Sequence, residues 1–559
     1  MKLPWRAGAS AAVQTTSPAA PRLLQRIVEA IRSDSEMRAQ VILPQYARPG
    51  RRTTVFWFCL GLAACCFAYG FGFGLMAPAR IVQFGFPLLG LAALTVWALP
   101  ELGTAPTRTM EKFFYVFFLS IPLWPNYLAI ALPGLPWITM LRLVGFPLVF
   151  MLVVSVSISR SFRKEMGEAL GGAPMLWRFV TAFAILQVLS VGLSNAPQIS
   201  IQRLLVAQVN WIAMFFIAAY VLRKPGRAEL WAALLVAAAV VVTAIAIREF
   251  QLQKVLWAGH IPSFLAVEDE SVQRVLNIGF RAGTLRYRSQ ATYSTALGLG
   301  EFLAVATPFI LHFIAGPYRL WVRLLALPLL PFIFLGIYLT DTRLSVVGFI
   351  MSIGIYIFFW GALRWQQDRK GLLGPAIVLS YPATAVAFIA AVLIVPRLRM
   401  MTLGGGQHQA STEARYAQWA EGIPLVLSHP WGFGIARGAP ALGYTNPGGV
   451  MTIDTYWLLT ALDYGLVGFF LFYGAYLIAM WKGFWTIARG VKAREVLLLI
   501  PLTISLFVYV VIKSIYAGVE NQSITFIMLG AVAALVYRAN AEKTADGVPI
   551  TSRIRRRRM

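Results

Sequence analysis

Long apolar runs are the feature that most constrains this chain. Fourteen runs of roughly twenty residues follow one another between residues 55 and 539. At a rise of about 1.5 Å per residue, a helix of this length crosses a hydrocarbon core about 30 Å thick. The runs lie at 55–75, 80–99, 113–132, 140–158, 176–194, 203–222, 229–249, 291–315, 322–340, 344–362, 374–395, 453–481, 495–516 and 522–539. The sequence therefore predicts an all-α polytopic membrane bundle of about fourteen transmembrane helices.

The composition also favours a membrane protein over a soluble one. Hydrophobic residues make up 58% of the 559 positions and charged residues only 13%, with a mean hydropathy of +0.68. Soluble domains carry roughly 25% charged residues, so this chain lacks the polar surface that contact with water on all sides requires. The net charge of +26 does not indicate nucleic acid, because the basic residues stand in short groups between apolar runs. Membrane lipids are expected around the chain, and nucleic acid is not expected as a partner.

The spacing of these basic groups predicts the orientation of the chain. Lysine and arginine are enriched in the cytoplasmic connections of membrane proteins. If the first residue is cytoplasmic, every connection on that side is basic, and the short outer connections are almost free of lysine. The cytoplasmic groups include Arg108 and Lys112, Arg160 to Lys164, Arg223 to Arg227, Arg319 and Arg323, Arg364 to Lys370, Lys482 to Arg494, and the arginines at 553–558. Both termini are therefore predicted to be cytoplasmic.

This alternation divides the chain into seven segments. They are a basic cytoplasmic arm at 1–54, membrane helices at 55–249, an outer loop at 250–290, membrane helices at 291–395, a large outer loop at 396–452, membrane helices at 453–539 and a basic cytoplasmic tail at 540–559. In a compact bundle, loops longer than about 12–15 residues are usually functional or disordered. The two long outer loops are therefore the candidate functional segments.

The large outer loop is predicted to be partly helical. Tyr416 and Trp419 stand at helical spacing, and Pro424 predicts a break or kink after them. The HPWGFG segment at 429–434 then predicts a glycine-rich turn. We expect a short helix that lies on the outer surface of the membrane.

Six arginines stand in outer segments, where positive charge is disfavoured. They are Arg281, Arg286, Arg288, Arg343, Arg415 and Arg437. A guanidinium group keeps its charge and binds phosphate through two parallel hydrogen bonds, which suits a pyrophosphate-linked substrate. The alternative is that each arginine reaches the membrane interface or pairs with a nearby carboxylate such as Asp341.

Carboxylates at membrane depth are the other candidates for chemistry. Asp454 stands at the outer mouth of the predicted span 453–481, which makes it the best placed. Asp463 and Glu301 lie inside spans and are expected to make structural hydrogen bonds between helices. His429 precedes a proline in the glycine-rich turn, where fixing the turn is a simpler role than catalysis. The sequence has no metal-ligand spacing and no Walker-type phosphate loop, so no metal and no other cofactor is expected.

Several short motifs follow one another in the second half of the chain. Residues 281–284 read RAGT, 342–345 read TRLS, 414–419 read ARYAQW, 429–434 read HPWGFG, 454–458 read DTYWL and 465–468 read GLVG. This series resembles the O-antigen ligase and O-antigen polymerase superfamily. In that superfamily an arginine-bearing helix precedes a glycine-rich turn, an H/D-N-x-Y-L motif and a further glycine.

The resemblance implies a GT-C-like membrane glycosyltransferase on the periplasmic face of the bacterial inner membrane, so that both long loops would be periplasmic. Such an enzyme moves a glycan from undecaprenyl pyrophosphate to a hydroxyl of a glycan or lipid acceptor, without a metal. The implied catalytic residues are Asp454, Arg415 and Arg343. The implied substrate-binding residues are Arg281, Arg286, Arg288, Arg437 and His429. A flippase and a chain-length regulator would be its protein partners.

One departure from the pattern bears on the reaction. The ligases have His-Asn where this chain has Asp454-Thr455. The ordinary pKa of aspartate is near 3.9 and that of histidine near 6.5, and neighbouring arginines are expected to lower the pKa of Asp454 further. Asp454 would then be a weak base that serves only if the acceptor hydroxyl becomes acidic late in the transition state.

The departure favours a polysaccharide polymerase, with the ligase as the alternative. A lipid-linked oligosaccharide flippase is the alternative from another class. A flippase should place cationic residues in a central cavity, whereas the spans of this chain look poor in buried charge.

Overall fold

The computed structural model describes residues 104–131, 137–267, 269–277, 286–394, 409–445, 451–490 and 493–547, together with residues 57, 61, 64 and 68. The helices are α4 Thr107–Leu123, α5 Met140–Ile158, α6 Arg160–Gly171, α7 Pro174–Ser190, α8 Pro197–Ala207, α9 Ala213–Val221, α10 Arg227–Leu252, α11 Glu270–Asn277, α12 Ala296–Ala315, α13 Leu320–Ala326, α14 Leu329–Leu339, α15 Arg343–Gln367, α16 Leu373–Ile394, α18 Gln409–Ser428, α19 Gly438–Leu442, α20 Tyr456–Ala488, α21 Leu499–Lys513 and α22 Gln522–Gly547. Strands β1 Ala129–Ile130 and β2 Ile138–Thr139 pair antiparallel. Short helical turns are η1 Val191–Leu193, η2 Gln208–Ile212, η3 Ser263–Leu265 and η5 Val496–Leu498.

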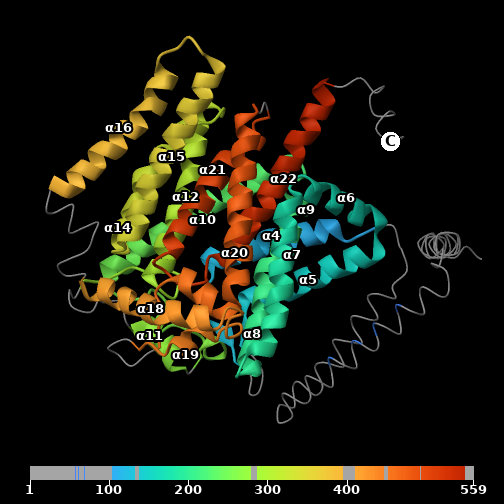
Figure 1. Ribbon diagram of the computed structural model, residues 1–559, viewed down its shortest axis with the longest axis vertical. Helices are drawn as coiled ribbons and strands as arrows, with labels where there is room; N and C mark the ends of the chain where they lie inside the picture. Colours follow the sequence, from blue (N-terminus) through green and yellow to red (C-terminus); the bar gives the residue numbers. More distant parts are fainter. Residues whose placement is uncertain are drawn as a thin grey trace, which may run out of the picture.

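The protein is an all-α polytopic membrane protein, as the sequence predicts. In the described part of the chain, eleven helical segments are long and apolar enough to cross a membrane, and each matches a predicted run. The predicted runs at 55–75 and 80–99 lie almost wholly outside the described residues. Most of the long helices run side by side, while α16 stands at one edge and packs against α15 (Figure 1).

The predicted run at 113–132 is wrong in its boundaries. Its helix, α4, begins six residues earlier and ends at Leu123, so it has only 17 residues. Pro122 and Pro125 lie at this end, and proline has no backbone N–H with which to continue a helix. The early start includes Glu111, which hydropathy assigns to a loop. Its carboxylate pairs with Lys224 at 3.0 Å and with Arg227 at 2.7 Å, so the charge is neutralised within the helix bundle.

The centre of the bundle is formed by α12, α21 and α22. These three helices are the most deeply buried of the candidate spans, at 78–83% of the apolar window. Helix α12 packs against α14, α15 and α21, and α20 packs against α7, α21 and α22. The helices that carry candidate motifs, α15 and α20, therefore both pack against this buried core.

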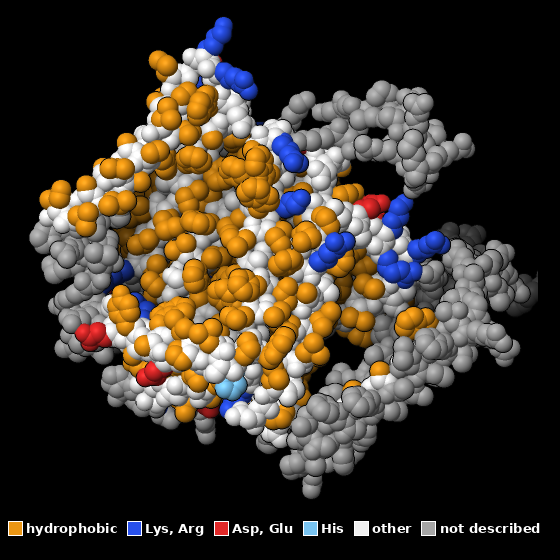
Figure 2. Space-filling view, in the orientation of Figure 1, with side chains coloured by type: hydrophobic (Ala, Val, Ile, Leu, Met, Phe, Trp, Pro, Cys, Tyr) orange, Lys and Arg blue, Asp and Glu red, His pale blue; other side chains and the backbone are white. Residues whose placement is uncertain are grey.

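The short elements gather at one end of the bundle, which we call the loop face. It is formed by the β1–β2 hairpin, η3, α11, α18 and α19, and the C-terminal end of α22 lies at the opposite end (Figure 1). Tyr127 and Ala129 of the hairpin segment pack against Val267 and Val272 from the first long loop. On the side seen in Figure 2, hydrophobic side chains cover the middle, and most lysines and arginines lie towards the end opposite the loop face.

Helix α20 contains a break that the sequence analysis does not predict. Gly465 has φ 70° and ψ −175°, a backbone conformation that is essentially restricted to glycine. The break leaves backbone groups of the flanking turns without partners inside the helix. In a membrane such groups must be satisfied by other parts of the protein.

Candidate functional site

One face of α18 determines which side chains of the large loop approach α20. Arg415, Gln418, Gly422 and Val426 recur at spacings of three and four residues, which places them along one side of the helix. Gln418, Gly422 and Val426 are buried, and a Cβ at Gly422 would lie 2.7 Å from the Leu458 side chain of α20. This close approach brings Arg415 and Gln418 to the start of α20. The helix continues through Pro424 to Ser428, so the predicted break there does not occur.

Asp454 lies at this contact, two residues before α20 begins. Its backbone N–H donates to Oε1 of Gln418 at 2.8 Å, and its carboxylate is half-buried and within electrostatic reach of Arg415. Burial raises the pKa of the Asp454 carboxyl above its ordinary value, and the charge of Arg415 opposes this shift only in part. Arg415 acts in the expected direction, but burial outweighs it, so the expected net lowering of this pKa is wrong. A raised pKa makes the carboxylate a better proton acceptor at neutral pH.

Two further polar atoms are buried beside Asp454. They are Nε2 of Gln418 and Oγ1 of Thr455, and neither has a hydrogen-bond partner among the described residues. Both residues have no exposed surface. Buried polar groups are normally hydrogen-bonded, so these two enclosed groups are unusual features of the contact between α18 and the start of α20. Gln418 is a site residue that the sequence analysis misses, because a single glutamine on a helix face carries no motif.

The arginines of the first long loop meet the turn before α15. Arg286 lies 3.6 Å from Asp341 and 4.9 Å from the ring of Tyr338. Arg288 donates from Nε to the carbonyl of Thr340 at 3.0 Å. The alternative interpretation, pairing with Asp341, is thus the one that the structure gives for Arg286. Asp341 has a positive φ of 49°, which marks a tight turn at this place.

Arg343 is the first residue of α15 and is exposed. A helix N-terminus carries a partial positive charge, so a cation in the first turn is unfavourable to the helix itself. The exposed guanidinium and the N-terminus of α15 together make this end of the helix locally positive. Arg281, another of the implied substrate-binding residues, lies outside the described residues.

The glycine-rich turn at 429–434 fits into the break in α20. The N–H groups of Phe433 and Gly434 donate to the carbonyls of Leu462 and Asp463, and the N–H of Leu466 donates to the carbonyl of Pro430. No Cβ fits at Gly432 or Gly465, because each would lie within 2.5 Å of backbone atoms of the other segment. The motif therefore has a structural role, which is to close the broken helix.

His429 and Arg437 flank this turn and lie apart from Asp454. The His429 ring is exposed, packs 4.4 Å from the ring of Phe433 and shares a hydrogen bond with Ser428. Arg437 donates from Nε to Oδ1 of Asn195 at 2.6 Å. Neither contributes to the pKa shift of Asp454, for which Arg415 is the charged neighbour.

Asp463 makes the structural hydrogen bonds that the sequence analysis predicts. Its Oδ1 accepts from the backbone N–H of Gly438 at 2.6 Å, and the N–H groups of Ala436 and Arg437 also face the carboxylate. The side chain thus ties α19 to the buried half of α20.

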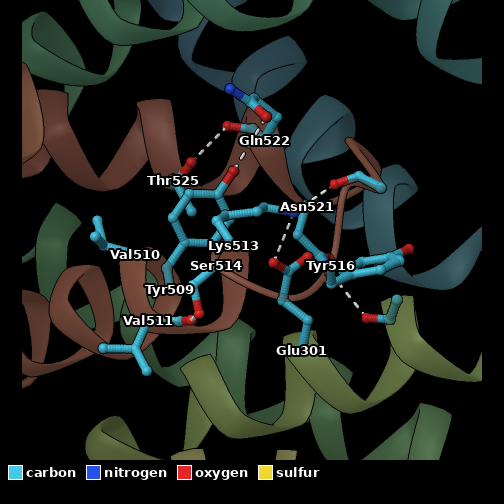
Figure 3. Close-up of polar contacts among 12 residues, drawn as sticks. Glu301, Tyr509, Val510, Val511, Lys513, Ser514, Tyr516, Asn521, Gln522 and Thr525 are labelled. Atoms are coloured by element: carbon cyan, nitrogen blue, oxygen red, sulfur yellow. Dashed lines mark hydrogen bonds and ion pairs between the residues drawn. The ribbon is translucent and has the colours of Figure 1, made fainter. Parts of the chain in front are cut away.

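A buried ion pair lies behind this region, between α12 and α21. Lys513 and Glu301 are 2.7 Å apart and both side chains have no exposed surface. Asn521 donates from Nδ2 to Glu301 at 2.9 Å, and the Lys513 ammonium also donates to the carbonyl of Gly518 (Figure 3). The expectation that the spans hold little buried charge is therefore wrong at this place. Lys513 lies inside the predicted run 495–516 and is the last residue of α21.

This ion pair connects the start of α15, which carries Arg343, to the start of α20, which lies beside Arg415. Gly300 leaves no room for a Cβ against Thr342 and Ser345, which flank Arg343. Glu301 is the next residue and binds Lys513, whose ammonium lies 5.5 Å from the ring of Tyr456. Tyr456 follows Asp454 by two residues. A continuous set of contacts therefore fixes the start of α15 relative to the start of α20.

Most of the motifs described above fall in a segment that matches a known family model. Residues 328–473 match the Wzy_C family model, which is described as O-antigen ligase. This segment is similar to the O-antigen ligase family. The matched range includes Arg343, Arg415, Asp454 and the break at Gly465, but not the arginines of the first long loop. A search of curated proteins finds no match.

Members of this family are glycan-transferring membrane enzymes of polysaccharide biosynthesis, and the match at residues 328–473 supports a function of this type. Such enzymes act on a lipid-linked glycan and an acceptor in a membrane. Within the described ranges, no three His, Cys, Asp or Glu side chains come together as metal ligands.

Proposed function

We propose that the protein is a polysaccharide polymerase, which joins glycan repeat units carried on undecaprenyl pyrophosphate. In each step the bond between the glycan C1 and the pyrophosphate breaks, and its electron pair leaves with undecaprenyl pyrophosphate. A hydroxyl of the acceptor glycan forms the new bond to C1 and gives its proton to the carboxylate of Asp454. The lipid carrier supplies the leaving group, so the step requires neither a nucleotide sugar nor a metal.

The observation that carries this proposal is the contact between Asp454 and α18. A half-buried carboxylate, held by its backbone to Gln418 and opposed by Arg415, is suited to accept a proton. Gln418 is fully buried and, through its Oε1, fixes the backbone of Asp454. Arg415 then stands where the pyrophosphate gains charge as it leaves.

Arg343 is the second proposed pyrophosphate ligand. It lies at an N-terminus that favours anions, and its position is fixed by Thr342 and Ser345 against α12. Arg286 and Arg288 hold the turn that precedes it, through Asp341 and Thr340. We therefore assign Arg286 and Arg288 to positioning Arg343, and we assign Arg343 and Arg415 to the substrate.

The ligase is the second candidate, because the matched family model is described as O-antigen ligase. Its chemistry at Asp454 and Arg415 would be the same, and only the acceptor would differ. A flippase is disfavoured, because Lys513, the cation found in the core, is fully enclosed and paired with Glu301.

We further propose that the loop face is periplasmic and that the protein lies in the inner membrane. The gathering of basic side chains towards the opposite end supports this orientation (Figure 2). A reporter that is active only in the cytoplasm should work when fused after Lys370 and fail when inserted within α18. The reverse result would place the proposed site in the wrong compartment.

Reconstitution tests the function itself. The purified protein in liposomes should convert undecaprenyl-pyrophosphate-linked repeat units into longer chains and release undecaprenyl pyrophosphate, with EDTA present. Addition of lipid A–core as a competing acceptor distinguishes polymerase from ligase. Transfer to lipid A–core in preference to a second repeat unit would establish the ligase, and the absence of any transfer would exclude both.

A further inference from the structure

An apolar groove of about 470 Å³ lies on the side of the bundle, between α5 and the α8–η2 segment. Phe146, Pro147, Leu205 and Val206 line its length. No motif of the sequence falls in it, and it lies outside residues 328–473. A groove of this kind between membrane helices accommodates a hydrocarbon chain.

Two arginines stand at the groove. Arg142, near the start of α5, lines it directly, and Arg203 lies in α8 next to the lining residue Gln202. The two guanidinium groups are close enough to repel each other electrostatically. Arg142 donates to the carbonyl of Trp137, and Arg203 acts electrostatically on the carboxylate of Asp463. Two like charges held together beside an apolar groove favour an anionic group between them.

The inner wall of the groove also carries an unsatisfied polar atom. Asn210 belongs to the π-helical turn η2, lines the groove and is only 6% exposed. Its Oδ1 has no hydrogen-bond partner among the described residues. π-Helical turns inside helices are frequent at functional sites. The wall is held close to α5 at Gly145, where a Cβ would lie 3.1 Å from Val209 and 3.3 Å from Oδ1 of Asn210.

The groove lies next to the broken helix but separate from the Asp454 region. Arg203 acts electrostatically on Asp463, whose backbone carbonyl receives the glycine-rich turn. Neither Arg142 nor Arg203 contributes to the pKa shift of Asp454. The segment that follows the turn contacts α8, because Ser200 donates from Oγ to the carbonyl of Ile435 at 2.8 Å.

We propose that this groove binds the polyprenyl chain of a second lipid-linked glycan, with its phosphates held by Arg142 and Arg203. The inference rests on the proposed function, because joining two lipid-linked repeat units requires two lipid-binding places. Arg343 and Arg415 account for one pyrophosphate, and the groove supplies a second cationic site with a hydrocarbon channel attached. The two carriers would approach from opposite sides of α18 and α19, so that their glycans meet at the loop face.

Direct binding tests the groove without turnover. Native mass spectrometry of the protein in nanodiscs can count bound undecaprenyl pyrophosphate, with undecaprenol and phosphatidylglycerol as comparison lipids. We expect two bound molecules for the unaltered chain and one for the Arg142→Gln/Arg203→Gln variant. The affinity of the lost site should fall about tenfold or more, because charge-assisted hydrogen bonds to phosphate disappear.

A second variant tests the hydrocarbon channel. Val206→Trp should fill the groove and abolish the same binding event, while Val241→Trp on the exposed face of α10 should not. Arg178→Gln, an arginine that contacts only the ring of Trp177, is the control for loss of charge. Unchanged binding in both groove variants, or equal occupancy by phosphatidylglycerol, would overturn the proposal. The Asp454→Asn variant should still bind two molecules, so failure of the groove and failure of the proposed chemistry give different results.

Discussion

Gly465→Ala tests whether the glycine-rich turn closes the broken helix. An L-residue in this backbone conformation costs about 1–3 kcal/mol. The new Cβ would also lie 2.2 Å from the carbonyl oxygen of Pro430 and 2.5 Å from the carbonyl carbon of Trp431, backbone atoms that cannot rotate away. Separating the two segments breaks at least two of their three backbone hydrogen bonds, each worth about 0.5–1.5 kcal/mol. Together these effects predict a loss of about 2–6 kcal/mol in the free energy of unfolding.

The assay is unfolding in mixed micelles with increasing sodium dodecyl sulfate, followed by tryptophan fluorescence. Gly354→Ala in α15 is the matched control, because a Cβ at Gly354 meets nothing within 4 Å. This control should be neutral or more stable by about 0.5–1 kcal/mol, as alanine is the better helix former. If Gly465→Ala lost no more stability than Gly354→Ala, the turn would not hold the helix and the structural role of the HPWGFG motif would be refuted.

Three further predictions concern the site and the core. Arg415→Lys keeps the charge but loses the paired guanidinium hydrogen bonds, so polymer yield should fall although the protein level in the membrane is unchanged; wild-type polymer from this variant would exclude the pyrophosphate role. Because the carboxylate of Asp454 must be unprotonated to accept a proton, the rate of transfer should decline as the pH falls through its raised pKa. Arg415→Gln removes the charge that lowers this pKa, so the decline should shift to higher pH. Coincident pH–rate profiles of the two proteins would contradict the assignment. Lys513→Met should cost about 3–5 kcal/mol by leaving Glu301 buried without its cation, and Lys513→Met/Glu301→Leu should recover most of this loss in the same unfolding assay.

Hydropathy predicts the helices well because lipid imposes one length and one polarity on every span. Eleven of the predicted runs form helices that are long enough to cross a membrane. The method fails where a charge is neutralised inside the bundle. Glu111 belongs to α4 because Lys224 and Arg227 pair with it. Partners far apart in the sequence cannot be read from a local window.

The candidate site is likewise predicted only in part from the sequence. Asp454 and Arg415 are predicted from their motifs, and α18 brings them together. The pKa shift of Asp454 is predicted with the wrong sign, because burial depends on how α18 packs against α20 and outweighs the single nearby arginine. Gln418 is missed for the same reason. Among the described arginines of the outer segments, Arg286 pairs with Asp341 and Arg437 donates to Asn195, so these two have separate partners.

The most direct test of the proposed function is the Asp454→Asn variant in cells that make the polymer. The amide keeps the size of the side chain and loses its capacity to accept a proton, so transfer should slow by about 10²–10⁴-fold. Asp368→Asn is the matched control, an exposed aspartate that accepts hydrogen bonds from the backbone of Lys370 and Gly371. The measurement is the length distribution of undecaprenyl-pyrophosphate-linked glycan on the periplasmic face. We predict single repeat units without long chains for Asp454→Asn and normal chains for Asp368→Asn, whereas normal long chains from Asp454→Asn would contradict the proposed role of this carboxylate.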